Sequence, residues 1–235
     1  MQAPDTVTRT TMAEQAYAAL KARIVGGELT CGQRLLPHAL AAALQVSLTP
    51  VKEALLRLER DGLVETEARR GVVVRRFHAE EIRDLYGLRT LLEVDAVRAG
   101  FARGGIASDL IDAMEAEQAA LMAALRHRTL PGLNTALQHD RALHALIVGL
   151  AGNKLGVAWH AQAMMQTHTV RIYTPATYTP KLLRDEHGAI IAALRSGDEH
   201  AASDALRRHL DRSLRDLLTR VAAMDGMGDG LGAGP

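Results

Sequence analysis

Four residues in the second half of the chain could bind one metal ion. Asp140 and His144 stand four positions apart, His187 follows in a later segment of helical periodicity, and His209 lies twenty-two residues beyond it. Side chains at i and i+4 leave the same face of a helix, so the carboxylate and the first imidazole can share an ion. Such a set of one oxygen and three nitrogens suits zinc, nickel, manganese or iron, and it leaves positions open for water or a carboxylate ligand.

The same residues also admit a simpler interpretation. The chain has 10 histidines, an Asp-x-x-x-His pair is often only a surface pair, and a lone helical histidine usually packs or is solvated.

Arg89 raises a similar choice, because it stands four positions before Glu93. It can form a bidentate pair with an organic acid whose other end meets the metal, or a structural ion pair with Glu93. His168 and Arg171 are further candidates to line such a cavity.

The elements that must position these residues are helices. Apolar residues recur at helical spacing through residues 79–222, and no strand pattern interrupts them, which predicts an antiparallel bundle of about six helices. Because a short Ser-Gly-Asp turn joins the last two helices, His187 and His209 should be neighbours. The expected helices are 79–102, 108–126 with Ser108 as its cap, 134–149 after a Leu130-Pro131-Gly132 turn, 152 to about 173, 182–195 after a loop over 174–180, and 198–224.

Residues 9–77 have the parts of a winged helix-turn-helix, a DNA-reading fold. Three short helices and a hairpin are expected: the first from a Thr10 or Thr11 cap to Gly26-Gly27, the second opened by Pro37, the third capped by Ser47 or Thr49 and ended by Gly62, and the hairpin turning at Arg69-Arg70-Gly71. In such a fold the third helix fits the major groove and the wing meets phosphate or the minor groove. The alternative is a small helical subdomain with a solvated charged face. The candidate DNA-binding residues are Arg34, Ser47, Thr49, Lys52, Arg57, Arg69 and Arg70.

Composition and charge agree with this division. Hydrophobic residues make up 48% of the 235 residues and aromatic residues only 3%, so the core must consist of aliphatic side chains that favour helix. Residues 1–77 carry 11 Lys/Arg and 8 Asp/Glu, a balance of +3, and the remainder carries 17 and 19, a balance of −2. The single cysteine, Cys31, excludes an intrachain disulfide and fits a reducing compartment. No signal core or membrane-length apolar run is found, so we expect a soluble cytoplasmic protein, with a disordered Gly-rich tail over 225–235.

Residues 14–76 resemble the DNA-binding domain of GntR-family bacterial regulators. The matching stretch is CGQRLLPHALAAALQVSLTPVKEALLRLERDGLVETEARRGVVV, in which the family's motifs fall at Gly32 to Leu35, Leu40-Ala41, Val46-Ser47, Thr49-Pro50-Val51, Glu53-Ala54-Leu55, Arg57-Leu58-Glu59, Gly62-Leu63-Val64 and Gly71. Two positions depart from the pattern. The family's usual arginines are Leu48 and Lys52 here, and in the family these positions tend to contact DNA. Leucine cannot donate to guanine and lysine lacks the planar fork of arginine, which suggests an atypical operator preference.

The second half is similar to the FCD domain, the effector-binding domain of the FadR subfamily of GntR regulators. The matching residues are Arg89 and Glu93, Asp140 and His144 with the following Gly152-Asn153, Glu186-His187, Gly197-Asp198 and Arg208-His209-Leu210. The resemblance implies that Asp140, His144, His187 and His209 hold a divalent metal. It places the chain near the six-helix subgroup, and the family's usual phenylalanine before the second ligand is Leu143 here.

Together the two resemblances imply a transcriptional regulator, more often a repressor, that responds to a metabolite and is not an enzyme. The effector implied is a small organic acid bound beside the metal. One short recognition helix reads few base pairs, so a homodimer on a palindromic double-stranded operator is expected. Two alternatives are a metal-dependent hydrolase, which would need a general base near the metal, and a regulator whose metal is purely structural.

Overall fold

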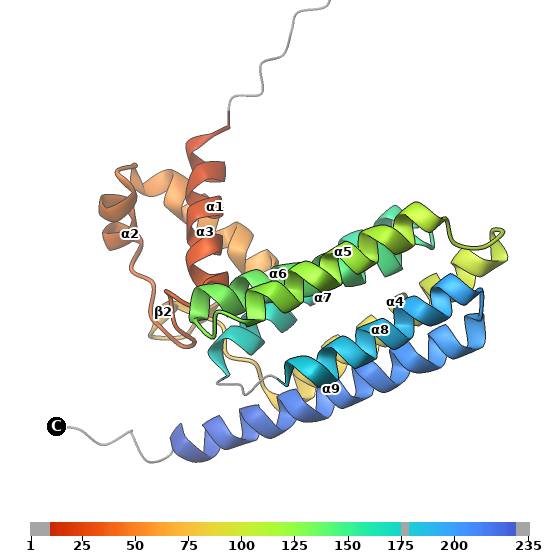
Figure 1. Cartoon of the computed structure of the whole chain (residues 1–235). Helices are drawn as coiled ribbons and strands as arrows, with labels where there is room; N and C mark the ends of the chain where they lie inside the picture. Colours follow the sequence, from red (N-terminus) through yellow and green to blue (C-terminus); the bar gives the residue numbers. More distant parts are fainter. Residues whose placement is uncertain (1–9, 175–178, 229–235) are drawn as a thin grey trace, which may run out of the picture. The chain divides into compact units, whose positions relative to one another are not determined.

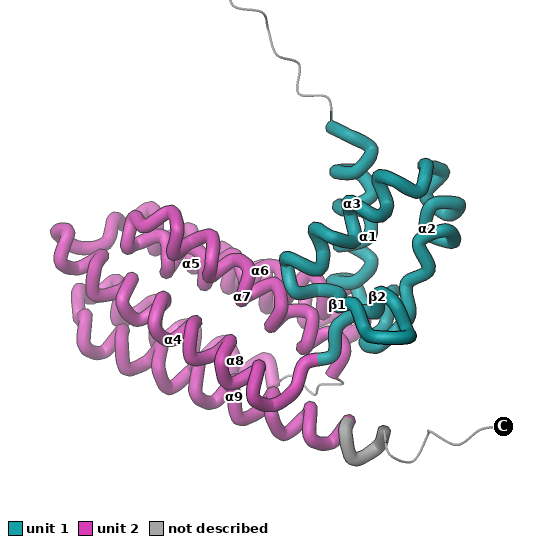
Figure 2. The backbone as a smooth tube through the Cα atoms, turned by 180° about the vertical axis from the view of Figure 1, so that it is seen from behind, with its two compact units in different colours: residues 1–76 teal, residues 77–235 magenta. Residues whose placement is uncertain are grey.

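The computed structural model describes residues 10–174 and 179–228, and side chains up to residue 224. The chain divides into two compact units, Met1–Arg76 and Phe77–Pro235 (Figure 2). Within the described residues, no single helix is both long enough and apolar enough to cross a membrane.

Unit 1 has the helices and the hairpin of a winged helix-turn-helix. Its elements are α1 Met12–Val25, α2 Pro37–Leu44, α3 Leu48–Arg60, β1 Val64–Glu67 and β2 Gly71–Val74. Thr11 begins α1 with a capping box to Glu14, and Pro37 occupies the first turn of α2, as the sequence predicts. Ser47 is the cap residue of α3, but its side chain makes no capping hydrogen bond. Helices α1 and α3 pack against each other around the fully buried Leu20 and Leu58.

The wing contains one pairing that the sequence pattern did not predict. Strands β1 and β2 pair antiparallel, with Val64 opposite Val74, and the connecting turn holds Arg69 at φ 72° and Gly71 at φ 76°. Arg34 adds an antiparallel bridge to Val73. The half-buried Cys31 donates its thiol hydrogen to the Arg75 carbonyl at 3.2 Å. The segment before α2 is thereby held against β2.

Unit 2 is an all-helical bundle. Over residues 77–174 and 179–228 its six helices are α4 Ala79–Ala102, α5 Ser108–Leu125, α6 Leu130–Gly149, α7 Lys154–Tyr173, α8 Pro180–Ser196 and α9 Glu199–Gly228 (Figure 1). Helices α8 and α9 lie side by side, as the short turn between them predicts, and α4 packs against both α7 and α9.

Several predicted boundaries in unit 2 were wrong. Leu130-Pro131-Gly132 is the first turn of α6, because the Thr129 hydroxyl accepts the Gly132 amide and a proline is tolerated there. Helix α5 has Ala107 in the cap position, and Ser108 is its first residue. Helix α8 starts at Pro180, two residues before the predicted start. Helix α9 continues to Gly228, four residues into the predicted tail; residues 229–235, and 175–178 of the predicted loop, lie outside the described part.

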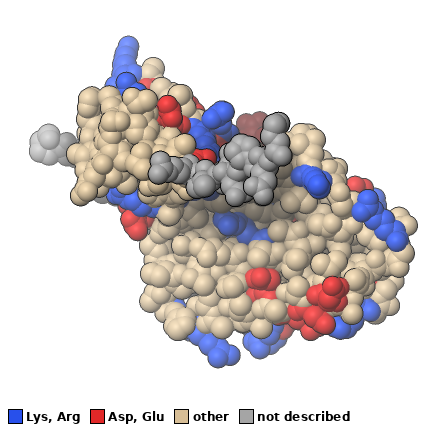
Figure 3. All heavy atoms as spheres, turned by 90° about the horizontal axis from the view of Figure 1, so that it is seen from above, with Lys and Arg blue, Asp and Glu red and all other residues tan. Residues whose placement is uncertain are grey.

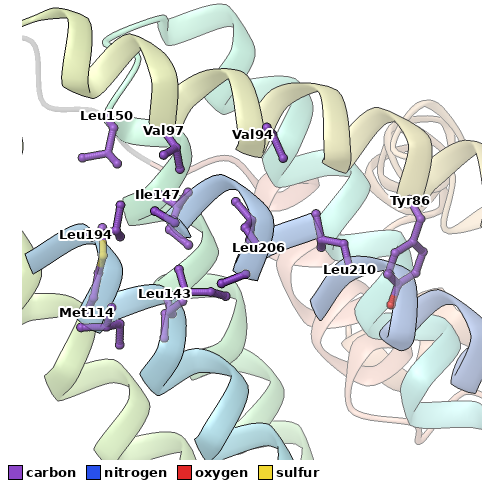
Figure 4. Packing of buried hydrophobic residues seen from close by; sticks show 14 of the residues in the cluster. Tyr86, Val94, Val97, Met114, Leu143, Ile147, Leu150, Leu194, Leu206 and Leu210 are labelled. Atoms are coloured by element: carbon purple, nitrogen blue, oxygen red, sulfur yellow. The ribbon is translucent and has the colours of Figure 1, made fainter. Parts of the chain in front are cut away.

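The bundle is held together by one large aliphatic cluster. Leu143 and Ile147 of α6 meet Leu194 of α8 and Leu206 of α9 in it, and all four are buried (Figure 4). Val94 and Val97 supply the contribution of α4. Because residues three to four apart on each helix point into this cluster, the polar residues on the same faces are buried with it.

Candidate functional site

The bundle brings the four predicted metal ligands together. Asp140 and His144 project from α6, His187 from α8 and His209 from α9, and none is more than 3% exposed. One ring nitrogen of each histidine lies within 4.8 Å of those of the other two. The Asp140 Oδ1 atom is 3.8 Å from Nε2 of His144 and 3.5 Å from Nε2 of His187. These separations are within the range spanned by ligands of a single ion.

The atoms that face this centre are unpartnered. Among the described residues, Asp140 Oδ1, His144 Nε2 and both ring nitrogens of His187 have no hydrogen-bond partner. A buried polar atom without a partner costs about 1–3 kcal/mol, and buried polar groups are normally paired. A divalent cation would satisfy these atoms together, so the donor set fits a metal of the zinc, nickel, manganese or iron class.

Two of the histidines are oriented by carboxylates that bind their Nδ1 atoms. His144 Nδ1 donates to Glu93 Oε2 at 2.6 Å, and His209 Nδ1 donates to Glu186 Oε2 at 2.9 Å. An imidazole held in this way presents Nε2 to a metal in the unprotonated form, and such supporting hydrogen bonds raise metal affinity. Glu186 in turn accepts hydrogen bonds from Nε and Nη2 of Arg212.

Arg171 supports Asp140, the fourth predicted ligand, a role that the sequence did not reveal. Its Nη1 donates to Asp140 Oδ2 at 3.1 Å, and its Nη2 donates to the hydroxyls of Tyr86 and Ser213. Burial by itself would raise the pKa of Asp140, but Arg171 and the three nearby histidines hold that pKa below the usual range of an aspartate. The carboxylate is therefore ionised and ready to bind a cation.

Arg89 forms the structural ion pair that was one of the two expectations for it. Its Nε donates to Glu93 Oε1 at 2.8 Å in a fully buried ion pair, and its guanidinium lies over the Tyr86 ring, 5.0 Å from the centroid. Both of its terminal nitrogens nevertheless have no hydrogen-bond partner among the described residues. The ion pair with Glu93 thus leaves two buried donors available to an acid.

Glu93 connects a further histidine to this cluster. His160 of α7 places Nε2 at 3.0 Å from Glu93 Oε1, so Glu93 contacts Arg89, His144 and His160 at once. Sequence reasoning gave His160 no role, because the 67 positions between it and Glu93 leave no local spacing to recognise. His168, named as a possible cavity residue, instead bonds Asn134 at 2.8 Å.

The buried histidines predict an acid-sensitive fold. Burial lowers the pKa of His168 to about 3 and places the pKa of His187 and His209 below the ordinary value. An unfolded histidine takes up its proton near pH ~6.5, so as the pH falls below that value protons bind the unfolded chain first and stability is lost. Between about pH 7.5 and about pH 5.5, a histidine whose folded pKa lies far below this range, as for His168, should remove about 1.4 kcal/mol.

Chemical denaturation with chelator present, repeated across this pH range, measures the effect. His168→Gln keeps a polar partner for Asn134 but does not titrate, so its unfolding free energy should fall less steeply with acidification. A free energy that stays constant from about pH 7.5 to about pH 5.5 would contradict the assignment of these histidines as neutral.

Unit 1 exposes the residues predicted to read DNA. Leu48 is only half-buried at the start of α3, and Leu56 on the same helix is 60% exposed. Two of the predicted side chains already have protein contacts: Arg57 lies 4.0 Å over the Tyr17 ring, and Arg70 bonds Glu67 and the Gly32 carbonyl. On the face drawn in Figure 3, basic side chains are scattered and form no continuous field. The exposed candidates are Arg34, Ser47, Thr49, Lys52, Arg57, Arg69 and Arg70.

Comparisons with known proteins match both units. The family model "Bacterial regulatory proteins, gntR family" matches residues 12–74, and that of the FCD domain matches residues 84–212. A protein of Streptomyces ambofaciens, described as an HTH-type transcriptional regulator in an unstable DNA locus, is 28% identical over 210 residues, which cover 88% of this chain and 85% of that protein. A probable D-xylose utilization operon transcriptional repressor of Paenarthrobacter nicotinovorans is 28% identical over 206 residues, with 87% and 88% covered.

A solved structure shares the arrangement as well. A protein from Rhodococcus sp. RHA1, described as a transcriptional regulator GntR, superposes with a TM-score of 0.74 at 25% identity and covers 88% of this chain and 97% of its own. The matched families and relatives are transcriptional regulators rather than enzymes. The chain therefore belongs to the GntR family of bacterial regulatory proteins and carries an FCD domain C-terminal to its DNA-binding domain.

Proposed function

We propose that this regulator is a repressor whose operator binding responds to a small carboxylate held between a divalent metal and Arg89. The observation that carries the proposal is the convergence of unpartnered buried atoms: Asp140 Oδ1, His144 Nε2 and the His187 nitrogens on one side, and the terminal nitrogens of Arg89 on the other. Glu93 connects the two sides, because one oxygen of its carboxylate accepts Nδ1 of His144 and the other accepts Nε of Arg89.

A small organic acid satisfies both sides. Its carboxylate supplies oxygen to the open positions of a metal with three histidine ligands and one aspartate ligand, and a guanidinium fork binds a second carboxylate or hydroxyl group with parallel hydrogen bonds. A metal bound at these residues would act as a Lewis acid that holds the acid in place. Ligand binding in the bundle would then alter DNA binding by favouring one of two states of the protein. The description of the Paenarthrobacter relative as a repressor supports repression as the direction.

Operator release tests this proposal. The operator is first selected from a random duplex library, and fluorescence anisotropy then follows its binding to the full chain in the presence of Zn²⁺, Ni²⁺ or Mn²⁺ and a panel of acids. An active acid should release the operator from wild type but not from Arg89→Gln. Arg195→Gln is the matched control, since Arg195 is an exposed arginine of α8 paired with Asp112 and Glu115. Release that does not depend on metal or on Arg89 would contradict the effector site, and protein stabilised by metal without any acid response would make the metal structural.

A homodimer is the second part of the proposal. Helices α4 and α7 pack against each other and expose large apolar side chains: Leu91 is 72% exposed, Leu155 58% and Trp159 53%. Contiguous exposed apolar side chains are typical of protein interfaces. Sedimentation of wild type should show a dimer. The double variant Leu91→Asp with Trp159→Gln should shift the equilibrium toward monomer. Leu182→Asp changes a 42% exposed leucine of α8 and should leave the dimer intact. A monomeric wild type at working concentration would contradict this part.

The departure at Leu48 makes a separate prediction about sequence preference. Leu48→Arg adds five donors at the start of α3, where a guanidinium can reach guanine O6 and N7. We expect a guanine to become preferred at one position in each half-site, with about 1–3 kcal/mol of discrimination against other bases. Selection from a random library with both proteins measures the change. Leu36→Arg, on an exposed leucine before α2, adds the same charge and should only strengthen binding without a new base preference; identical consensus sequences for Leu48→Arg and wild type would contradict the prediction.

A further inference from the structure

A groove on the outer side of the bundle lies apart from the metal ligands. It runs between α6 and α7 and encloses about 240 Å³. Its walls are mainly apolar, with three alanines and the side chains of Met164 and Met165, and Arg141 and His160 supply the main polar groups. The groove is therefore an apolar cleft that contains one permanent cation.

That cation has no anionic partner in the described part of the chain. The Arg141 guanidinium is half-buried, and its one hydrogen bond runs from Nη1 to the Met165 Sδ atom at 3.3 Å. A thioether sulfur is a weak acceptor. The buried Arg171 and the partly buried Arg212 and Arg220 each bind a carboxylate. Since cations removed from water are normally paired, Arg141 resembles one half of an ion pair whose other half comes from outside the chain.

We propose that this groove binds a small organic acid with an apolar body, whose carboxylate pairs with Arg141 and whose body packs on Met164 and Met165. A guanidinium binds a carboxylate through two parallel hydrogen bonds, and methionine adapts its shape to an apolar or aromatic ligand. The apolar walls favour such an acid over inorganic phosphate, because small-molecule sites are mostly apolar with a few placed polar groups. The site does not depend on a metal being bound.

Hydrogen bonds between side chains connect the groove to the predicted metal centre. His160 lines it and bonds Glu93 at 3.0 Å, and Glu93 accepts the Nδ1 hydrogen of His144 at 2.6 Å. A ligand in the groove therefore lies two hydrogen bonds from a metal-ligating imidazole. This is the route by which an acid in the groove would influence the effector site.

Methionine methyl NMR of the full-length protein provides the test, with 4-fluorobenzoate as the probe. In protein labelled with ¹³C at the methionine methyl groups, the signals of Met164 and Met165 should move saturably as the probe is added. The signal of Met114, which is fully buried in the aliphatic cluster, should not. Acetate, which has the carboxylate without the apolar body, should move the signals of Met164 and Met165 only at much higher concentration.

Four variants test the proposal. Arg141→Gln should raise the dissociation constant of the probe at least tenfold, Arg141→Lys should raise it less, and Arg195→Gln should leave it unchanged. Equal affinity for wild type and Arg141→Gln, or unmoved signals of Met164 and Met165, would overturn the proposal. Arg89→Gln separates the two sites, provided that its helical circular dichroism shows that it is folded: if the folded variant no longer binds the probe and Arg141→Gln still does, the acid binds beside the metal, and the groove proposal fails while the proposed function stands.

Discussion

Glu93→Gln should lower the free energy of unfolding by about 3 kcal/mol or more. The Glu93 carboxylate is fully buried and contacts Arg89, His144 and His160. Burial by itself would raise the pKa of Glu93, but Arg89 and His144 hold that pKa well below the usual range, so the group is a buried anion. The amide keeps the shape of the side chain and removes its charge, which leaves the Arg89 cation buried without compensation. Removing one partner of a buried pair is among the more destabilising single changes.

Chemical denaturation measures the loss, and two further variants interpret it. Glu115→Gln removes the same charge from a half-exposed pair with Arg195, so it should cost less than about 1 kcal/mol. Arg89→Met combined with Glu93→Leu removes both charges and should recover part of the stability, because an apolar pair of similar volume has no unpaired charge. If Glu93→Gln and Glu115→Gln have equal effects, the Glu93 cluster does not stabilise the bundle. Metal affinity should fall about 10- to 100-fold in Glu93→Gln, as is usual for residues that orient a ligand.

Divalent metal should raise the melting temperature of the chelator-treated protein by about 10 °C. A ligand present at about 1,000 times its dissociation constant stabilises the folded state by about 4 kcal/mol, and about 1 kcal/mol corresponds to about 2–4 °C for a chain of this size. The gain should be large here because the bound ion also satisfies buried atoms that otherwise have no partner, among them His187 Nδ1 or Nε2 and Asp140 Oδ1. Zn²⁺, Ni²⁺ and Mn²⁺ titrations followed by differential scanning calorimetry measure the shift.

His187→Gln should abolish most of that shift. The glutamine cannot replace an imidazole ligand at the same reach, and His187 has no other hydrogen bond to lose among the described residues. His200→Gln is the matched control, because the His200 side chain is 92% exposed and lies on the first turn of α9. An undiminished metal response in His187→Gln would show that the ion binds elsewhere. A response that is absent in wild type would remove the metal from the proposed function.

The sequence predicted the parts of the site that depend on local spacing. Asp140 and His144 share a helix face by their i, i+4 separation, and Arg89 and Glu93 form the ion pair that the same rule allows. The short turn between α8 and α9 brings His187 and His209 together, with ring centroids 4.7 Å apart. The bounds of α4 agree with prediction at both ends, since the apolar periodicity runs unbroken to a Gly-Gly pair.

The missed contacts depend on how the helices pack. His144 and Glu93 are 51 positions apart and His160 and Glu93 are 67 apart, and no sequence period links residues on different helices. The sequence marked Arg171 only as one of several possible cavity residues. Its bond to Asp140 depends on how α6 and α7 are rotated relative to each other, which local spacing does not fix. The start of α6 was misplaced for a different reason: Pro131 and Gly132 are typical of turns, but the Thr129 hydroxyl caps the helix ahead of them.

The positions of Cys31 and Trp159 allow resonance energy transfer to be measured between the two units. The sequence has one cysteine and one tryptophan, and they fall in different units, with the half-buried thiol beside the wing and the indole on the exposed side of α7. An acceptor dye on the thiol would take up excitation energy from the indole with an efficiency that depends steeply on their separation. Metals and candidate acids could then be ranked by how far they change the energy transfer between unit 1 and unit 2, with no residue substituted and no operator known.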